Sequence, residues 1–359
     1  MPPTLRWALS RIPMRKEEKQ RLEREELEQR GFVSNLERLL VAVDDSPNGK
    51  FALRTAGVLA GTHGMPATVL HVPDPSKIES TMPEYPANMA AGAAKSSEKT
   101  PDQKRSNGRE DSKKTNKVDE KTEKEEKKAE DAADAVQQVA AQIKDKQKKE
   151  DKVTDPVDVT TIVHEQPSPA VIAEEAEKGY DVFIIGIGQV SKQSHEFDPG
   201  VTNLAKGFDG PLIVSAMRGD LQEYPDGKLS ILIPVNGTEP SRRGAEVAIT
   251  LARAAKAQVT VLYVAVRPAN RRAMRGSRRH EEAILKDIVA IADGYNISIR
   301  TAVVAERAAN EAIVAELKRR NHNLVVLGVG RRPGERLFFG DTAAALLEKS
   351  ERSLLFVAS

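Results

Sequence analysis

The chain of 359 residues contains no cysteine, which excludes disulfides, thiolate nucleophiles and cysteine-based zinc or iron–sulfur sites. Aromatic residues make up 4% of the chain, too few for a base-stacking platform, and the formal net charge of +2 gives no basic field. No apolar run approaches the roughly 18–20 residues that span a bilayer, and no signal-peptide pattern opens the sequence. The composition predicts a soluble protein that does not bind nucleic acid.

What the chain does contain is an internal repeat of strands and helices. The interval from Val43 to Val72 equals the interval from Val235 to Val264, and each reads as turn, helix and strand after a first apolar strand. Strands that alternate with helices require a parallel sheet covered on both faces. We therefore predict an α/β fold of two tandem doubly wound, Rossmann-like domains. The remaining strands are predicted at 159–163, 182–188 and 212–214 in the first copy and at 299–304, 324–330 and 354–357 in the second.

The repeat sets the domain organisation. We predict a linker or tail over residues 1–34, a first domain over 35–217 and a second over 226–359. An insertion of about residues 75–128 interrupts the first domain, and between Ala94 and Ala129 its only aliphatic residue is Val118. Such a mixed-charge segment buries too little apolar surface to offset its ordering entropy. We predict that it is disordered, with a folded helix as the alternative.

The final stretch of the chain carries the clearest candidate for a ligand site. Gly328 and Gly330 follow an apolar strand, and Gly340 precedes an Ala/Leu-rich helix that Asp341 or Thr342 would cap. Glycines and the free N–H groups of a first helical turn suit an anion, although glycine after a buried strand also serves simply to make a turn. Positive charge is added to the same loop by Arg331, Arg332 and Arg336.

These residues resemble the universal stress protein family, whose phosphate loop has the pattern Gly-x2-Gly-x9-Gly-Ser/Thr. Gly330 and Gly340 have the required spacing, but the first glycine falls one residue late, and Asp341 replaces Ser or Thr. A carboxylate there repels phosphate unless it caps the helix or faces a metal. The strand order and the Asp-x-Ser turn at Asp44 fit the same family. The resemblance implies an adenine nucleotide alpha hydrolase-like fold, a pseudo-dimer through the closing strands, and ATP or AMP as ligand.

The resemblance also implies that three loops of each copy form a site, and each copy keeps one half of the signature. The first copy keeps Asp44, but Gly200 lies too far from Gly188 for the loop pattern, and no basic cluster follows. We rank the second copy first, although Asn236 replaces the aspartate there. Its candidate residues are Asn236, Gly237, Thr238, Val264, Gly328, Gly330, Arg331, Arg332, Gly340, Asp341 and Thr342. The weaker first-copy candidates are Asp44, Asp45, Ser46, Gly186 and Gly188.

A second resemblance concerns residues 1–32. The stretch Met1–Leu9 resembles the segment after the last transmembrane helix of bacterial cation:proton antiporters that carry universal stress domains, and Glu25–Phe32 resembles their linker. This implies a transmembrane antiporter half as partner, in the same or a separate chain, and a cytoplasmic location, with the cytoplasmic face of the inner membrane as one option. A homodimer is a further option.

Catalytic interpretations find little support in the sequence. His164 and His195 lack an acid, serine or cysteine partner at a recognisable spacing, and His280 lacks the second histidine of a zinc helix. No Walker lysine follows a glycine loop. Asp44 and Asp45 could ligate a metal, but turn and cap roles are more common for such a pair. We therefore predict a non-enzymatic sensor that regulates an antiporter. The alternatives are a free-standing stress-response protein acting by protein–protein contacts, and slow ATP hydrolysis.

Overall fold

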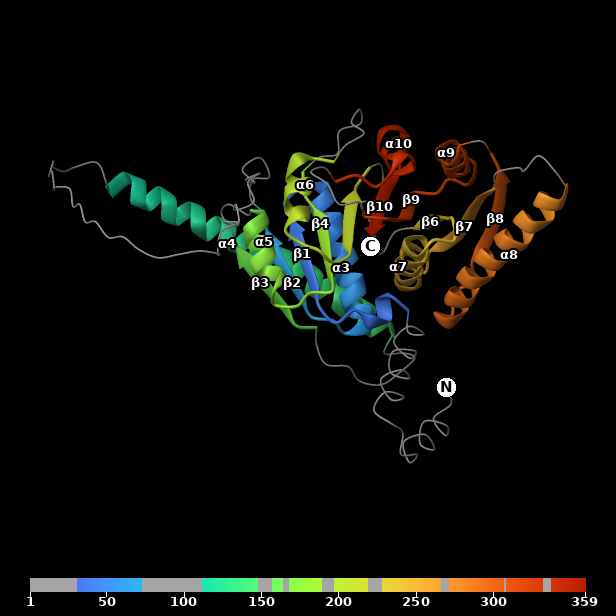
Figure 1. The fold of residues 1–359 in the computed structure, drawn as a ribbon. Helices are drawn as coiled ribbons and strands as arrows, with labels where there is room; N and C mark the ends of the chain where they lie inside the picture. Colours follow the sequence, from blue (N-terminus) through green and yellow to red (C-terminus); the bar gives the residue numbers. More distant parts are fainter. Residues whose placement is uncertain are drawn as a thin grey trace, which may run out of the picture.

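The computed structural model describes most of the chain, and Figure 1 shows its fold coloured along the sequence. The predicted tail, up to residue 30, and residues 75–111 of the insertion lie outside the described residues. The described residues are 31–72, 112–147, 157–163, 168–188, 197–218, 228–265, 271–306, 308–331 and 337–359.

Each of the two sequence copies forms a unit in which strands alternate with helices. The first unit contains η1 (Val33–Asn35), β1 (Leu39–Val43), α3 (Pro47–His63), β2 (Ala67–His71), α4 (Ser112–Gln147), β3 (Val159–Val163), α5 (Pro169–Ala176), β4 (Val182–Gly186), α6 (Pro199–Lys206) and β5 (Leu212–Ala216). The second contains β6 (Ser230–Val235), α7 (Glu239–Ala255), β7 (Gln258–Ala265), α8 (Arg271–Gly294), β8 (Arg300–Ala305), α9 (Ala309–Arg320), β9 (Leu324–Val329), α10 (Asp341–Lys349) and β10 (Ser353–Ala358). None of the described helices is both long and apolar enough to cross a bilayer.

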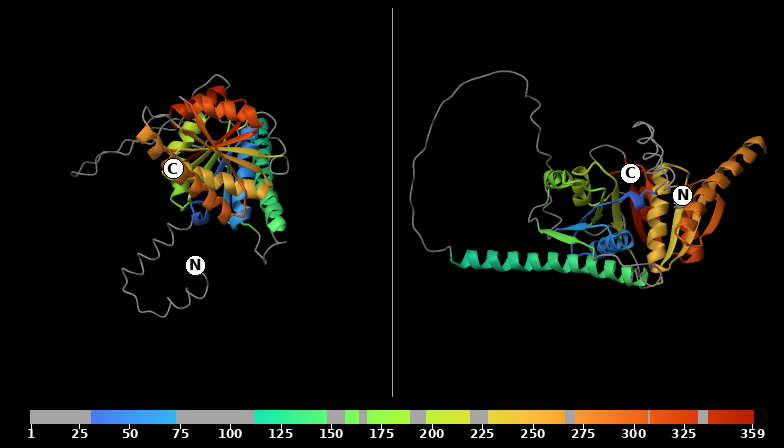
Figure 2. Two further views of the ribbon diagram at one scale, coloured as in Figure 1. Left: turned by 90° about the vertical axis from the view of Figure 1, so that its right-hand side faces the viewer. Right: turned by 90° about the horizontal axis from the view of Figure 1, so that it is seen from below.

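The strands form one sheet in the order β3-β2-β1-β4-β5-β10-β9-β6-β7-β8. Neighbouring strands within each unit are parallel, whereas β5 and β10 pair antiparallel, with Leu354 opposite Ala216 and Ala358 opposite Leu212. Seen end-on in Figure 2, the strands fan out with the strong twist expected of a large sheet. The predicted fold of two tandem doubly wound units is confirmed, and the closing strands join the units.

The two faces of the sheet bury separate cores, which explains the apolar strands of the sequence. Leu39, Val41 and Val43 of β1 pack on the face covered by α3, α4, α7 and α8, whereas Leu40 and Ala42 face α5, α6, α9 and α10. Alternate residues of a strand point to opposite faces, so a strand covered on both sides is apolar throughout. Each core contains residues of both units, and the units therefore share their packing as well as their strand pairing.

The charged insertion is only partly as the sequence predicted. Residues 112–128, predicted to be disordered, form the first part of α4, which Figure 2 shows extending beyond the sheet. Lysine and glutamate dominate this segment, and both lose little side-chain freedom in a helix. The second part of α4 anchors it, because Val136, Ala140 and Ile143 are buried. A Cβ on Gly57 of α3 would come within 2.7 Å of Val139, so the two helices pack closely.

An aromatic cluster and an arginine fasten the seam between the units. The Phe356 ring lies 5.4 Å from that of Phe197, in the first unit, and 5.7 Å from that of Phe339. Arg218, directly beyond β5, donates to the carbonyl oxygen of Ser350 at the end of α10, at 2.6 Å. A cation at a helix C-terminus is favourable because the last carbonyls carry partial negative charge.

Candidate functional site

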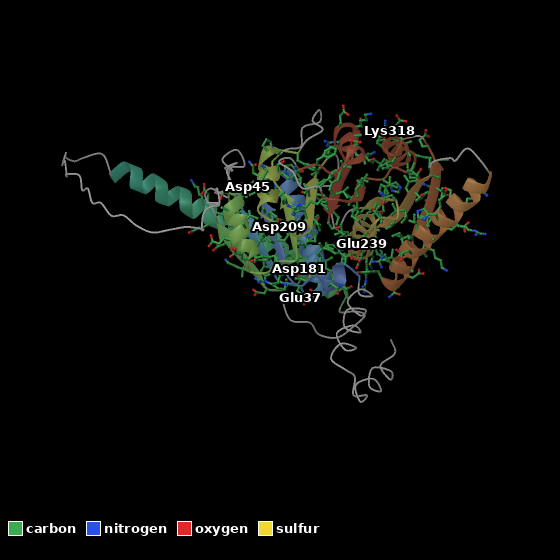
Figure 3. The ribbon with its side chains drawn as sticks, in the orientation of Figure 1. Glu37, Asp45, Asp181, Asp209, Glu239 and Lys318 are labelled. Atoms are coloured by element: carbon green, nitrogen blue, oxygen red, sulfur yellow. The ribbon has the colours of Figure 1, made fainter. Side chains whose placement is uncertain are left out.

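The predicted ligand loops follow β1, β2 and β4 in the first unit and β6, β7 and β9 in the second. Parallel strands bring such loops together at the C-terminal edge of each unit. Figure 3 shows Asp45, beyond β1, at one end of the first unit and Glu37, before β1, at the other. Because β5 and β10 are antiparallel, the C-terminal edges of the two units open in opposite directions at the seam. Each unit is therefore a separate candidate site.

The turn after β6 is built around the side chain of Asn236. Its Oδ1 accepts from the backbone N of Thr238 at 3.1 Å and from its Oγ1 at 2.7 Å. The backbone of Gly237 is left-handed, with φ of 83°, which glycine adopts without strain. The Asn236 amide nitrogen has no partner among the described residues, so it remains available as a donor to a ligand.

Gly328 has a packing role rather than an open position in a phosphate loop. A Cβ on this residue would overlap the carbonyl oxygen of Pro240 and lie 2.6 Å from Cα of Ser241, both in the first turn of α7. Gly186 holds the equivalent place in the first unit, where a Cβ would lie 2.5 Å from the carbonyl oxygen of Asn48 on α3. In both units, this glycine lets a helix lie directly on the fourth strand.

Gly330 and Gly340 are the two glycines of the predicted anion site. Among the described residues, nothing lies within 4 Å of a Cβ placed on either of them. Gly340 is the N-cap of α10, with φ of 94°, and no side chain caps the helix. The first-turn N–H groups, beginning at Asp341 and Thr342, thus have no side-chain cap among the described residues, as an anion site requires. Asp341 is exposed in that turn and does not act as the cap.

Arg331 does not take the predicted place beside a phosphate. Its guanidinium crosses the seam and donates to the carbonyl oxygens of Ala205 at 2.7 Å, of Gly210 at 3.0 Å, and of Phe208. Burial lowers the pKa of Arg331, and the carboxylate of Asp209 opposes that shift. It is a seam residue that caps the end of α6, whereas Arg332 lies outside the described residues.

Arg331→Ala is expected to lower the free energy of unfolding by about 1–3 kcal/mol, because three carbonyls lose a charged donor. Urea unfolding measures this loss. Nucleotide affinity of the folded variant should stay within about twofold of the wild type, since the guanidinium is engaged in the first unit. If the variant had unchanged stability but bound nucleotide much more weakly, Arg331 would be a phosphate-binding residue and not a seam residue.

A pocket of about 240 Å³ adjoins the Asn236 turn, between the start of α7 and α8. Val235, Gly237 and Thr238 line one side, and His280 and Ile284 of α8 line the other. No local sequence pattern pointed to the α8 residues, because only the fold brings this helix beside the turn. Predicted Val264 lies near the end of β7 and is half-buried against the core of the other face.

In the first unit, the ligand edge is occupied by its own side chains. Oδ2 of Asp44 accepts from the backbone N of Gly188 at 2.7 Å, and Oδ1 accepts from the backbone N of Ser46 at 3.1 Å. Asn48 donates to the carbonyl oxygen of Gly188 at 2.9 Å and accepts from the backbone N of Met217 at 2.6 Å. The loops after β1, β4 and β5 are thereby tied to one another.

Asp45 is engaged as well. It lies 2.5 Å from Nζ of Lys128 on α4 and 3.4 Å from Nε2 of His71 at the end of β2. The hydrogen bond from Lys128, more than that from His71, lowers the pKa of Asp45. Among the described residues, no three potential metal-ligating side chains cluster. The sequence could not foresee this contact, because Lys128 belongs to the segment predicted to be disordered.

The comparisons with known proteins agree with this architecture. The sequence profile of the universal stress protein family matches residues 35–195 and 229–358. A universal stress protein from Archaeoglobus fulgidus is similar in structure, with a TM-score of 0.51 and 14% identity over 89% of this chain and 97% of that one. No curated protein matches the chain in sequence.

Shorter solved proteins match one unit at a time. The universal stress protein UspA from Lactobacillus plantarum is 17% identical, covering 36% of this chain and 99% of its own, with a TM-score of 0.32. A universal stress protein in complex with cAMP is 20% identical, covering 36% of this chain and 95% of its own, with a TM-score of 0.30. The fold is thus that of a protein with two tandem doubly wound α/β units. The chain belongs to the universal stress protein family.

Proposed function

We propose that this protein is a non-catalytic sensor whose second unit binds an adenine nucleotide, ATP or AMP. The observation that carries the proposal is the uncapped first turn of α10 behind Gly340, together with Gly330, where no described residue lies within 4 Å of an added Cβ. Free N–H groups next to a glycine backbone form an anion site. In the described part of the first unit, by contrast, Asp44 and Asn48 already hold the loops of the ligand edge together.

In this proposal, separate groups of the second unit bind the phosphate, the nucleoside and the base. The phosphate lies at the first turn of α10, and the free amide nitrogen of Asn236 meets the nucleoside. The 240 Å³ pocket bounded by His280 and Ile284 receives the base. Asp341 is exposed in the turn that holds the phosphate, and its charge opposes each added phosphate group. We therefore expect AMP to bind more tightly than ATP when no metal ion is supplied.

Isothermal calorimetry of the purified chain with AMP, ATP and cAMP tests this proposal. Gly330→Val is expected to weaken AMP binding by about tenfold or more, because the side chain enters the space for the phosphate. Its stability should change by no more than about 0.5 kcal/mol, since no described residue lies within 4 Å of the new Cβ.

Gly294→Val is the matched control, because it also adds a side chain where nothing lies within 4 Å, at the far end of α8. It should bind AMP as the wild type does. If the wild type bound none of the three nucleotides, this result would contradict the proposed sensor function. It would favour the alternative, a stress protein that acts through protein–protein contacts.

We also propose that the nucleotide signal reaches a cation:proton antiporter at the cytoplasmic face of the membrane. The support is the antiporter-like sequence of residues 1–32, whose last residue, Phe32, is held on the second unit by Glu246. Cation:proton exchange in everted vesicles, with and without this protein, tests the link. Exchange should respond to AMP with the wild type and lose that response with Gly330→Val. Identical exchange in the presence and absence of the protein would remove the antiporter from the proposal.

A further inference from the structure

A second and larger pocket lies at the other end of the second unit, away from the candidate nucleotide edge. Its volume is about 390 Å³, within the range of pockets that bind small molecules. The residues that precede β7 and β8 line it, so it opens at the N-terminal ends of these strands. Ile143 of α4 also lines it, and the pocket therefore spans the seam between the units.

The charges at this seam pocket have one sign. Arg253 and Lys256, at the end of α7, line it and are exposed, and no carboxylate is among its described lining residues. His63 of α3 lies close enough that the charge of Arg253, after burial, helps to lower the pKa of the imidazole. Two cations with no carboxylate among the described lining residues attract an anion.

The helix ends at the pocket do not cancel this attraction. The carbonyl oxygen of Ala252, near the end of α7, accepts from the backbone N of Ala257 at 2.9 Å. That of Ala292, near the end of α8, accepts from the backbone N of Ile297 at 2.9 Å. With these carbonyls paired within the chain, the two helix ends present fewer free acceptors at the pocket mouth.

Asn296 and Ser298 add polar groups to the remaining wall, and the rest of it is apolar. Ile143 is buried and Ile297 is half-buried, and both present hydrocarbon to the pocket. The hydroxyl of Tyr295, another lining residue, donates to Glu246 at 2.9 Å, and the same carboxylate accepts from the backbone N of Phe32 at 2.5 Å. A ligand against Tyr295 would thus be one hydrogen bond away from Glu246, the residue that holds the start of the described chain.

We propose that the seam pocket binds a small amphipathic organic anion, independently of the nucleotide site. Its compact apolar or aromatic body lies against Ile143 and Ile297, and its acidic group lies between Arg253 and Lys256. Because Tyr295 joins this pocket to Glu246, occupancy would stiffen the attachment of the N-terminal segment to the second unit. The seam pocket would then supply a second input to the same sensor.

The fluorescent probe 8-anilinonaphthalene-1-sulfonate tests this proposal, with its uncharged counterpart N-phenyl-1-naphthylamine as the chemical control. The folded wild type should bind the sulfonate saturably. Arg253→Ala combined with Lys256→Ala should weaken it by about tenfold, because two charge-assisted contacts are lost, and should leave the uncharged probe unchanged. Ala257→Trp, which fills the pocket, should remove the binding of both probes.

Lys318→Ala combined with Lys349→Ala is the matched charge control, since both lysines are exposed on helices of the other face. It should bind the sulfonate as the wild type does. Equal sulfonate affinity of the wild type and both seam-pocket variants would overturn the proposal, and so would the absence of saturable binding to the folded wild type.

Discussion

Phe356→Ala is expected to lower the free energy of unfolding by about 3–5 kcal/mol, the range for deleting a buried phenylalanine. Phe356 is fully buried on β10, which pairs with β5 across the seam and with β9 in its own unit. Its ring meets Phe197 and Phe339, from the loops that precede α6 and α10. The cavity left by the missing ring would therefore loosen both loops as well as the central strands. Closing this cavity would require the two units to move relative to each other.

Urea unfolding at several protein concentrations measures this change. Phe338→Ala is the control, because Phe338 is 36% exposed and stands beside Phe339 in sequence, so its loss should be far smaller. The two units should still unfold in one transition, since each core contains residues of both. Equal and small losses for the two variants would show that the aromatic cluster does not hold the seam.

Glu246→Ala is expected to lower the free energy of unfolding by about 3 kcal/mol, because several buried donors lose a charged acceptor at once. The carboxylate is 1% exposed and accepts from the backbone N–H groups of Phe32 at 2.5 Å and Val33 at 3.0 Å, and from the hydroxyl of Tyr295. A Cβ on Gly31 would collide with it, so glycine is needed for this approach. Burial, more than the nearby carboxylate, raises the pKa of Tyr295 to about 12, so the hydroxyl donates at neutral pH.

The variant should also release the start of the chain. Limited proteolysis is expected to cleave Glu246→Ala near residues 31–38 much faster than the wild type, while the rest of the body stays resistant. Tyr295→Phe is the control, because it removes one neutral donor and leaves both backbone contacts, for a loss of about 1 kcal/mol. Cleavage of the two variants at equal rates would show that Glu246 does not anchor the N-terminal segment.

Much of the fold was predictable because it depends on local pattern. The strand predicted at 159–163 has those bounds in the structure, and the repeat located both units. Short apolar runs between turns indicate strands that are covered on both faces. Because these strands alternate with helices, the pattern predicts a parallel sheet. The pairing of β5 with β10 was predicted from the family resemblance and not from the residues themselves. An apolar run shows that a strand is buried, but it does not specify which other strand it pairs with.

The site was predictable only where one loop sufficed. Gly330 and Gly340 kept their predicted character because backbone freedom is a property of the residue itself. Arg331 is close to them in sequence, yet its contacts are with Ala205 and its neighbours in the other unit. Asp44 is bonded across to Gly188, and such long-range partners leave no local signal. The charged first part of α4 was predicted to be disordered, because the residues that anchor the helix lie C-terminal to that segment.

The central claim is that an adenine nucleotide binds at the second unit and not at the first. Photolabelling with 8-azido-AMP, followed by peptide mapping, tests it most directly. The label should fall on peptides of the 240 Å³ pocket, between residues 235 and 288, and should be displaced by AMP. Label on peptides around Asp44 or Gly188, displaced by AMP in the same way, would contradict the account, because those loops would then have to open for the ligand.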